Sequence, residues 1–136
     1  MAEAVAARTS ALKRILVVDD SSLVRLYYRN ALEKAGFTVD QAINGLEAME
    51  KVLSQAFDLV LVDVNMPRMD GLAFIAALRS EADAHIAATP ALMISTESEQ
   101  QDMLAATAAG ANFYLVKPVS EIELVKHVAV LTGAPS

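Results

Sequence analysis

Short apolar runs divide the chain at intervals and set the pattern of its fold. Four runs are continuously apolar, namely 15–18 (ILVV), 59–62 (LVLV), 91–94 (ALMI) and 113–116 (FYLV), and a fifth, 38–42 (TVDQA), is weaker. Continuous runs of this length, rich in β-branched residues, are typical of strands that are covered on both faces, as in a parallel sheet. The sequence therefore predicts five buried strands.

Between these runs the apolar residues recur at helical spacing. After the first run they are Leu23, Val24, Tyr27, Ala31, Leu32 and Ala35, and Gly36 follows as a stop. Only one of the adjacent Tyr27 and Tyr28 can face the core. In 46–53 the residues expected on one face are Leu46, Met49, Val52 and Leu53. Three more helices are predicted at 72–78, 103–109 and 122–131, and Gly110 and Gly133 stand where C-terminal caps are expected.

Strict alternation of five strands with five helices predicts an open α/β sheet with right-handed crossovers. The fold class that we expect is the flavodoxin-like (βα)5 sheet, with parallel strands in the order 2-1-3-4-5 and helices on both faces. The 136 residues suit one domain. We expect that domain at 13–132, with a flexible tail at 1–12 and a short C-terminal tail at 133–136.

Composition narrows the class of protein. Hydrophobic residues make up 54% and charged residues 21%, which favours a compact globular domain, and the chain has no cysteine for disulfides or thiol chemistry. The net charge of −6 argues against nucleic acid as the main ligand, because phosphate backbones are held by clustered Lys and Arg. The tail 1–12 lacks the apolar block of a signal peptide, and no run reaches the ~20 apolar residues of a membrane helix. We expect a soluble, cytoplasmic protein.

Polar side chains follow the predicted strands where each one ends. In doubly wound sheets, ligands bind outside the carboxyl ends of the strands, near the point where the strand order reverses. The residues at these ends are three acids, one hydroxyl and one amine: Asp19, Asp20, Asp63, Ser95 and Lys117. The sequence predicts that all five lie at one edge of the sheet.

The chemistry of this set points to a phosphoryl group. Strands one and three are neighbours about 4.8 Å apart in the expected order, so their acids can share one ion. Close carboxylates repel, and all-oxygen ligands favour Mg²⁺, or Mn²⁺, over Zn²⁺. Carboxylates, a divalent ion and Lys117 can hold a phosphoryl group while an oxygen of Asp63 attacks phosphorus. Ser95 could donate a hydrogen bond to a phosphoryl oxygen.

Four motifs carry a resemblance to a known family. They are VVDDSS at 17–22, LVDVNMPRMDG at 61–71, MIST at 93–96 and YLVKP at 114–118. In this order and spacing the chain resembles a two-component response-regulator receiver domain, most similar to the stand-alone CheY-like (chemotaxis) type. The resemblance covers residues 13–132, nearly the whole chain.

The resemblance implies roles for the residues at the strand ends. Asp63 would accept a phosphoryl group from a histidine kinase, a phosphotransfer protein or a small phosphodonor. The Mg²⁺ ligands would be Asp20, Asp63 and the backbone carbonyl of Asn65, with Asp19 acting largely through water. Ser95 and Lys117 would contact the phosphoryl group, and the bond between Lys117 and Pro118 would be cis.

The resemblance also implies a switch that changes affinity for a partner protein. Tyr114 would turn inward when Ser95 is drawn to the phosphoryl group, remodelling the surface formed by 103–109, 113–116 and 122–131. Asn65 and Glu97 match chemotaxis receivers with short-lived phosphorylation, whereas Thr96 stands where most receivers have Ala or Gly. The protein would modify only itself, turn over no outside substrate, and act on a downstream partner as a monomer or a weak phosphorylation-dependent dimer.

Simpler readings exist for single residues. Asp20 or Asp70 could cap a helix, and capping is the reading that we prefer for Asp70. Ser95 could cap the helix that follows it. Tyr114 could be an ordinary core aromatic residue.

Other functions remain for the chain as a whole. A flavin carrier needs a phosphate cradle after strand one, where this chain has DDSS at 19–22. A Mg²⁺-dependent phosphohydrolase would usually have a second acid at Asn65, because asparagine cannot exchange a proton in that role. A constitutive scaffold, a phosphate sink and a phosphorelay intermediate are the remaining alternatives.

Overall fold

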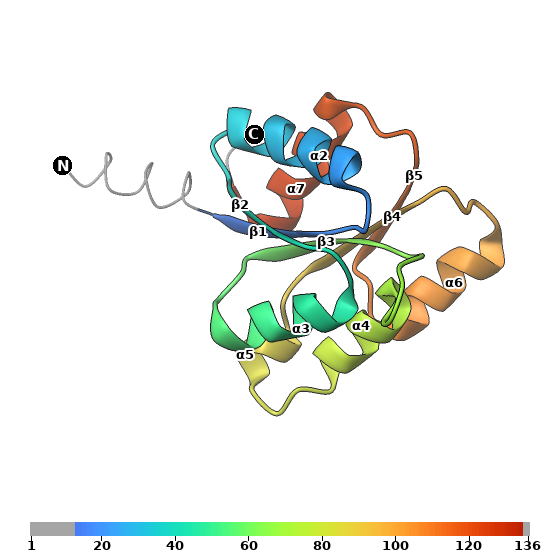
Figure 1. Cartoon of the computed structure of the whole chain (residues 1–136). Coiled ribbons are helices and arrows are strands. Elements are labelled where there is room, and N and C mark those ends of the chain that lie inside the picture. The colour runs from blue at the N-terminus through green and yellow to red at the C-terminus, as the bar shows by residue number, and fades with distance from the viewer. Residues whose placement is uncertain (1–12, 135–136) are drawn as a thin grey trace.

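The computed structural model describes residues 13–134 (Figure 1). The predicted tail at 1–12 and the last two residues of the C-terminal tail lie outside these residues. The elements, in chain order, are β1 (Arg14–Val18), α2 (Ser22–Lys34), β2 (Thr38–Ala42), α3 (Gly45–Ser54), β3 (Leu59–Asp63), α4 (Gly71–Arg79), α5 (Ala84–Ala87), β4 (Ala91–Ser95), α6 (Gln100–Ala109), β5 (Phe113–Val116) and α7 (Glu121–Thr132).

The five strands form one parallel sheet in the order β2-β1-β3-β4-β5. Helices α2 and α7 cover one face, and α3, α4, α5 and α6 cover the other (Figure 1). The predicted fold class and strand order are therefore confirmed. Among residues 13–134, no helix is both long and apolar enough to cross a membrane.

Two hydrophobic cores lie on opposite faces of the sheet. Because successive strand residues point to opposite faces, Ile15 and Val17 pack with α2 and α7, whereas Leu16 and Val18 pack with α3 and α4. The three central strands are buried on both faces, as their continuous apolar sequences predict. The carboxyl ends of these strands are thereby held at one rigid edge.

The helix faces differ in part from the predicted ones. In α3, Leu46 and Leu53 are 43% and 54% exposed, and the buried positions are Ala48 and Val52. Spacing alone cannot distinguish a face with large residues from one with small residues. The face of α3 with small residues packs on the sheet because Gly45 lies tightly against the loop after β3. A Cβ added to Gly45 would lie 2.8 Å from the Met69 carbonyl oxygen.

Helix α2 shows a similar rotation. Leu23 is 77% exposed although the spacing places it with the core, and of the two adjacent tyrosines Tyr28 is buried and Tyr27 is 42% exposed. The Tyr27 hydroxyl donates to the Val119 carbonyl at 2.9 Å, which ties α2 to the segment before α7. Burial raises the pKa of the Tyr28 phenol well above its usual range, with a further contribution from the charge of Asp19.

Helix starts depend on capping side chains. Helix α6 begins at Gln100 rather than at the predicted 103, because Glu99 and Asp102 form a capping box there. The short α5 escaped prediction because its single turn has no apolar periodicity to detect. Gly110 and Gly133 cap α6 and α7 in the left-handed conformation, as predicted.

Arg79 joins four segments at the edge of the sheet opposite the acids. Its guanidinium donates to the carbonyls of Ala87 (2.8 Å), Thr89 (2.7 Å) and Gly110 (3.0 Å) and to the Asn112 side chain (2.9 Å). Burial lowers the pKa of Arg79, but an arginine keeps its charge at neutral pH. Arg79 therefore fastens the end of α4 to α5, to β4 and to the end of α6.

We expect the substitution Arg79→Met to lower the free energy of unfolding by about 2 kcal/mol or more, because three carbonyl groups lose a charged donor. Urea denaturation of both proteins measures the difference. Lys34→Met is the control, since the Lys34 side chain is 73% exposed and its ion pair with Glu121 lies on the surface. Equal unfolding midpoints for the wild type and Arg79→Met would contradict the assigned role.

Candidate acidic site

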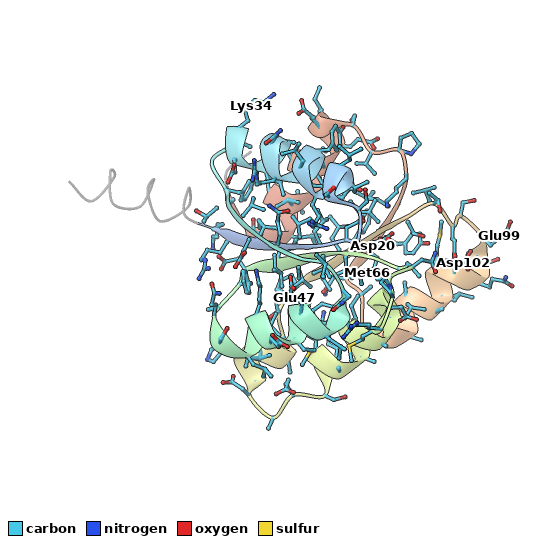
Figure 2. The ribbon with its side chains drawn as sticks, in the orientation of Figure 1. Asp20, Lys34, Glu47, Met66, Glu99 and Asp102 are labelled. Carbon is cyan, nitrogen blue, oxygen red and sulfur yellow. The ribbon has the colours of Figure 1, made fainter. Side chains whose placement is uncertain are left out.

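Three carboxylates meet at the carboxyl ends of β1 and β3. Asp19, Asp20 and Asp63 each place one carboxylate oxygen within 4.8 Å of the others. Asp19 is 2% exposed, Asp63 is mostly buried, and Asp20 lies on the surface where β1 leads into α2 (Figure 2). The strand order makes this meeting possible, since β1 and β3 are neighbours.

Lys117, which directly follows β5, extends its side chain toward these acids. Its Nζ lies 3.4 Å from Oδ2 of Asp19 and 3.3 Å from Oδ1 of Asp63. The Lys117 backbone donates to the Ser95 carbonyl at 2.8 Å, so the end of β4 positions it. The bond between Lys117 and Pro118 is cis, the isomer that the resemblance implies.

The charges of the site do not balance. Burial raises the pKa of Asp63, and the charge of Asp19 raises it further, while the ion pair with Lys117 offsets only part of this rise. One ammonium group faces three carboxylates. The oxygen ligands, their closeness and the residual negative charge fit a small divalent cation such as Mg²⁺ or Mn²⁺.

Ser95 is fully buried at the end of β4. Its Oγ accepts a hydrogen bond from the Glu97 backbone N–H at 3.1 Å. It does not cap α6, because Glu99 occupies that position at the outer end of the helix (Figure 2). The capping alternative for Ser95 is therefore wrong, and its hydroxyl hydrogen is free for another acceptor. The neighbouring Thr96 is exposed.

Glu97 connects three residues that the sequence singled out separately. Its backbone N–H reaches Ser95, and its Oε1 accepts from Nδ2 of Asn65 at 3.0 Å. Its carbonyl accepts from the Tyr114 hydroxyl at 2.7 Å. Tyr114 is half-buried, and its ring packs against the core of the α3 and α4 face. Sequence matching paired Asn65 with Glu97 but had no signal for the Tyr114 contact, which depends on the loop backbone.

The loop after β3 is closed by backbone contacts. Asp70 caps α4 by accepting from the Ala73 N–H at 2.8 Å, as expected. The Gly71 N–H donates to the Val64 carbonyl at 2.8 Å, and a Cβ on Gly71 would lie 2.1 Å from the Asp63 carbonyl oxygen. Only glycine permits this approach. Gly71 was not among the predicted site residues, although its place directly after Asp70 in a loop is a recognisable signal.

Comparison with known proteins identifies the family. The model of the response regulator receiver domain matches residues 15–129. The chain belongs to this family. Receiver domains are in general signalling domains rather than enzymes, they bind Mg²⁺ at an acidic pocket, and they interact with histidine kinases and downstream targets.

Individual relatives of this receiver domain differ in length. Chemotaxis protein CheY1 of Helicobacter pylori is 38% identical over 122 residues, which cover 88% of this chain and 97% of that protein. Transcriptional regulatory protein ResD of Bacillus subtilis is 36% identical over 118 residues, 87% of this chain and 47% of ResD. The chain thus spans about half the length of such transcriptional regulators.

A solved structure agrees with the fold and type of this receiver domain. Chemotaxis response regulator CheY4 of Vibrio cholerae superposes with a TM-score of 0.82 at 35% identity, covering 88% of this chain and 98% of that one. The receiver domain is thus CheY-like, as the four motifs lead us to expect.

The raised pKa of Asp63 predicts that the substitution Asp63→Asn increases the free energy of unfolding in a pH-dependent way. The pKa of Asp63 is higher in the folded protein than its ordinary value near 4, so the protonated carboxyl favours the folded state. This contribution to stability is lost as the pH rises from that ordinary value through the raised pKa. Without divalent ions, we expect Asp63→Asn to be more stable than the wild type at pH 7 and equal to it below about pH 4.

Urea denaturation in EDTA at several pH values measures this gain. Asp83→Asn is the control, because Asp83 caps α5 on the surface and asparagine caps a helix equally well. The account of the charges is wrong if Asp63→Asn is the less stable protein at pH 7.

Proposed function

We propose that this receiver domain is a phosphorylation-controlled switch that accepts a phosphoryl group on Asp63. One observation carries the proposal. Carboxylate oxygens of Asp63, Asp19 and Asp20 lie within 4.8 Å of one another, and Nζ of Lys117 lies 3.3 Å from Oδ1 of Asp63. A carboxylate so placed can act as a nucleophile with a cationic group beside it.

The proposed step is a single displacement at phosphorus. An Asp63 carboxylate oxygen forms a bond to phosphorus as the bond to the donor breaks, a P–N bond for phosphohistidine or a P–O bond for acetyl phosphate. The electron pair leaves with the imidazole or acetate, and Asp63 becomes an acyl phosphate. The charge of Lys117 and the hydrogen bond from its ammonium favour the ionised form of Asp63, which is the form that attacks phosphorus.

The surrounding side chains have distinct roles in this proposal. The Lys117 ammonium can pair with a phosphoryl oxygen without leaving the edge of the sheet, since it already lies beside Asp63. The Ser95 hydroxyl can donate to a phosphoryl oxygen while still accepting from the Glu97 N–H. Asp19, Asp20, Asp63 and the Asn65 carbonyl would hold Mg²⁺, or Mn²⁺, with Asp19 acting largely through water. The bound ion would neutralise charge on the carboxylates and the transferring group.

In the proposed switch, Glu97 transmits the change at Ser95 to Tyr114. A phosphoryl group that draws Ser95 toward Asp63 would also displace the Glu97 backbone, and with it the acceptor of the Tyr114 hydroxyl. Tyr114 lies on β5, which follows α6 and precedes α7 in the chain. The surface formed by these three elements includes exposed apolar side chains: Leu104, Phe113, Val116 and Ile122. Affinity for a partner on this face would change with phosphorylation.

The proposed partners follow from the site and the family. A histidine kinase or phosphotransfer protein would supply the phosphoryl group. A largely apolar cavity of about 350 Å³ beside Lys117, lined by Leu23, Tyr27 and Pro118 among others, suits docking of such a donor. We propose a cytoplasmic role in chemotaxis or related two-component signalling, which the similarity to CheY1 supports. A phosphate sink or relay intermediate would use the same site.

We expect acetyl phosphate and Mg²⁺ to add one phosphoryl group to the wild type and none to Asp63→Asn. Intact-mass spectrometry with and without Mg²⁺ measures the adduct. Asp83→Asn is the matched control and should label normally, since Asp83 lies at the N-cap of α5. An unlabelled wild type would support the scaffold alternative, and steady release of phosphate from varied phosphoesters would indicate a hydrolase.

We expect Thr96→Ala to shorten the lifetime of the adduct severalfold. Thr96 is exposed directly after Ser95, so its side chain can restrict the approach of water to the phosphoryl group. The rate of adduct loss after removal of acetyl phosphate measures this effect. Equal lifetimes in the two proteins would show that Thr96 does not restrict hydrolysis.

A further inference from the structure

Arg25, on α2, contacts the backbone of the acidic site rather than its carboxylates. Its Nη1 donates to the Asp19 carbonyl at 2.7 Å, and its Nε donates to Oε1 of Gln41 at 3.0 Å. We infer that Arg25 is a positioning residue for the metal site, which fixes the peptide between Asp19 and Asp20 and so orients both carboxylates. The inference rests on the proposed Mg²⁺-dependent function.

The backbone of Asp19 is held on both sides. Its N–H donates to the Ala42 carbonyl at 3.1 Å, which extends the pairing of β1 with β2, and its carbonyl accepts from Arg25. The Asp19 side chain is held as well, because Oδ1 accepts from the Ser21 N–H at 2.9 Å. The bond to Ala42 thus holds the peptide before Asp19, and Arg25 holds the peptide between Asp19 and Asp20.

Asp20 depends on that peptide plane more than Asp19 does. Within residues 13–134, the Asp20 side chain makes no hydrogen bond or ion pair, so its place beside Asp63 comes from the backbone alone. A rotation of the Asp19–Asp20 peptide would swing this carboxylate away from the other two. Loss of Arg25 should therefore act first on the ligand geometry.

Arginine suits this position better than lysine. The guanidinium is a planar fork that can meet two acceptors in fixed directions, here one at the end of β1 and one on β2. Both acceptors are neutral oxygens, so Arg25 occupies no carboxylate oxygen that a cation would need. A lysine would keep the charge but could not hold both acceptors in this geometry.

The test compares Mg²⁺ affinity across variants of the full chain, by calorimetric titration with MgCl₂. We expect Arg25→Lys to bind Mg²⁺ about tenfold more weakly, as for other residues that orient metal ligands. Gln41→Leu should also bind Mg²⁺ more weakly than the wild type, but by a smaller factor than Arg25→Lys, because it frees only one side of the guanidinium. The double variant should bind no more weakly than Arg25→Lys, since both changes act through one contact chain.

Arg29→Lys is the matched control, one turn along α2, where the arginine forms an ion pair with Glu33 at 3.7 Å on the surface. It should bind Mg²⁺ as the wild type does. In acetyl phosphate labelling, Arg25→Lys should need about tenfold more Mg²⁺ for half of the maximal rate and reach the wild-type maximum. A purely structural residue would not shift the Mg²⁺ dependence while leaving the maximum unchanged.

Mg²⁺ affinities within twofold of the wild type for both Arg25→Lys and Gln41→Leu would overturn the inference. A lowered maximal rate with unchanged Mg²⁺ dependence would also overturn it. If Arg25→Lys does not fold, Gln41→Leu decides alone. A wild type that binds no Mg²⁺ would overturn the proposed function, and this inference with it, whereas normal binding in all variants would overturn the inference alone.

Discussion

Repulsion among three carboxylates at one edge of the sheet is the constraint on which the rest of this structure depends. Asp19, Asp20 and Asp63 lie within 4.8 Å of one another, and a single ammonium group, that of Lys117, faces them. Burial raises the pKa of Asp63 and the charge of Asp19 raises it further, so the fold holds the ionised carboxylate at a cost. In the proposed function a cation, and then a phosphoryl group, would offset this cost.

Two well-packed cores hold the crowded edge in place. The central strands are buried on both faces, so their ends cannot spread to relieve the repulsion. Gly71 lets the loop after β3 close against Asp63, and Arg25 holds the end of β1 from α2. On the other side, Glu97 gathers contacts from Asn65, Ser95 and Tyr114. Backbone contacts therefore hold the ends of β1 and β3, and Glu97 links Ser95 to Tyr114 on the face where we propose that a partner binds.

The sequence predicts those features that depend on strand order and strand ends. Apolar runs followed by Asp19, Asp63 and Lys117 are enough to place the five charged and hydroxyl side chains at one edge, because parallel strands end together. The rotation of a helix about its axis could not be predicted from spacing alone. Leu46 and Leu53, which the spacing places on the core face of α3, are exposed. The contacts of Arg25 and Arg79 could not be predicted either, because their acceptors include backbone carbonyls whose positions no local residue pattern encodes.

The central claim is that these three carboxylates hold one divalent cation. A crystal structure of the full chain grown with MnCl₂, with the metal located by its anomalous signal, tests it most directly. The account predicts a single manganese peak among the carboxylate oxygens of Asp19, Asp20 and Asp63, with Lys117 displaced little. No peak at this edge, or a manganese ion held only elsewhere on the surface, would contradict the account.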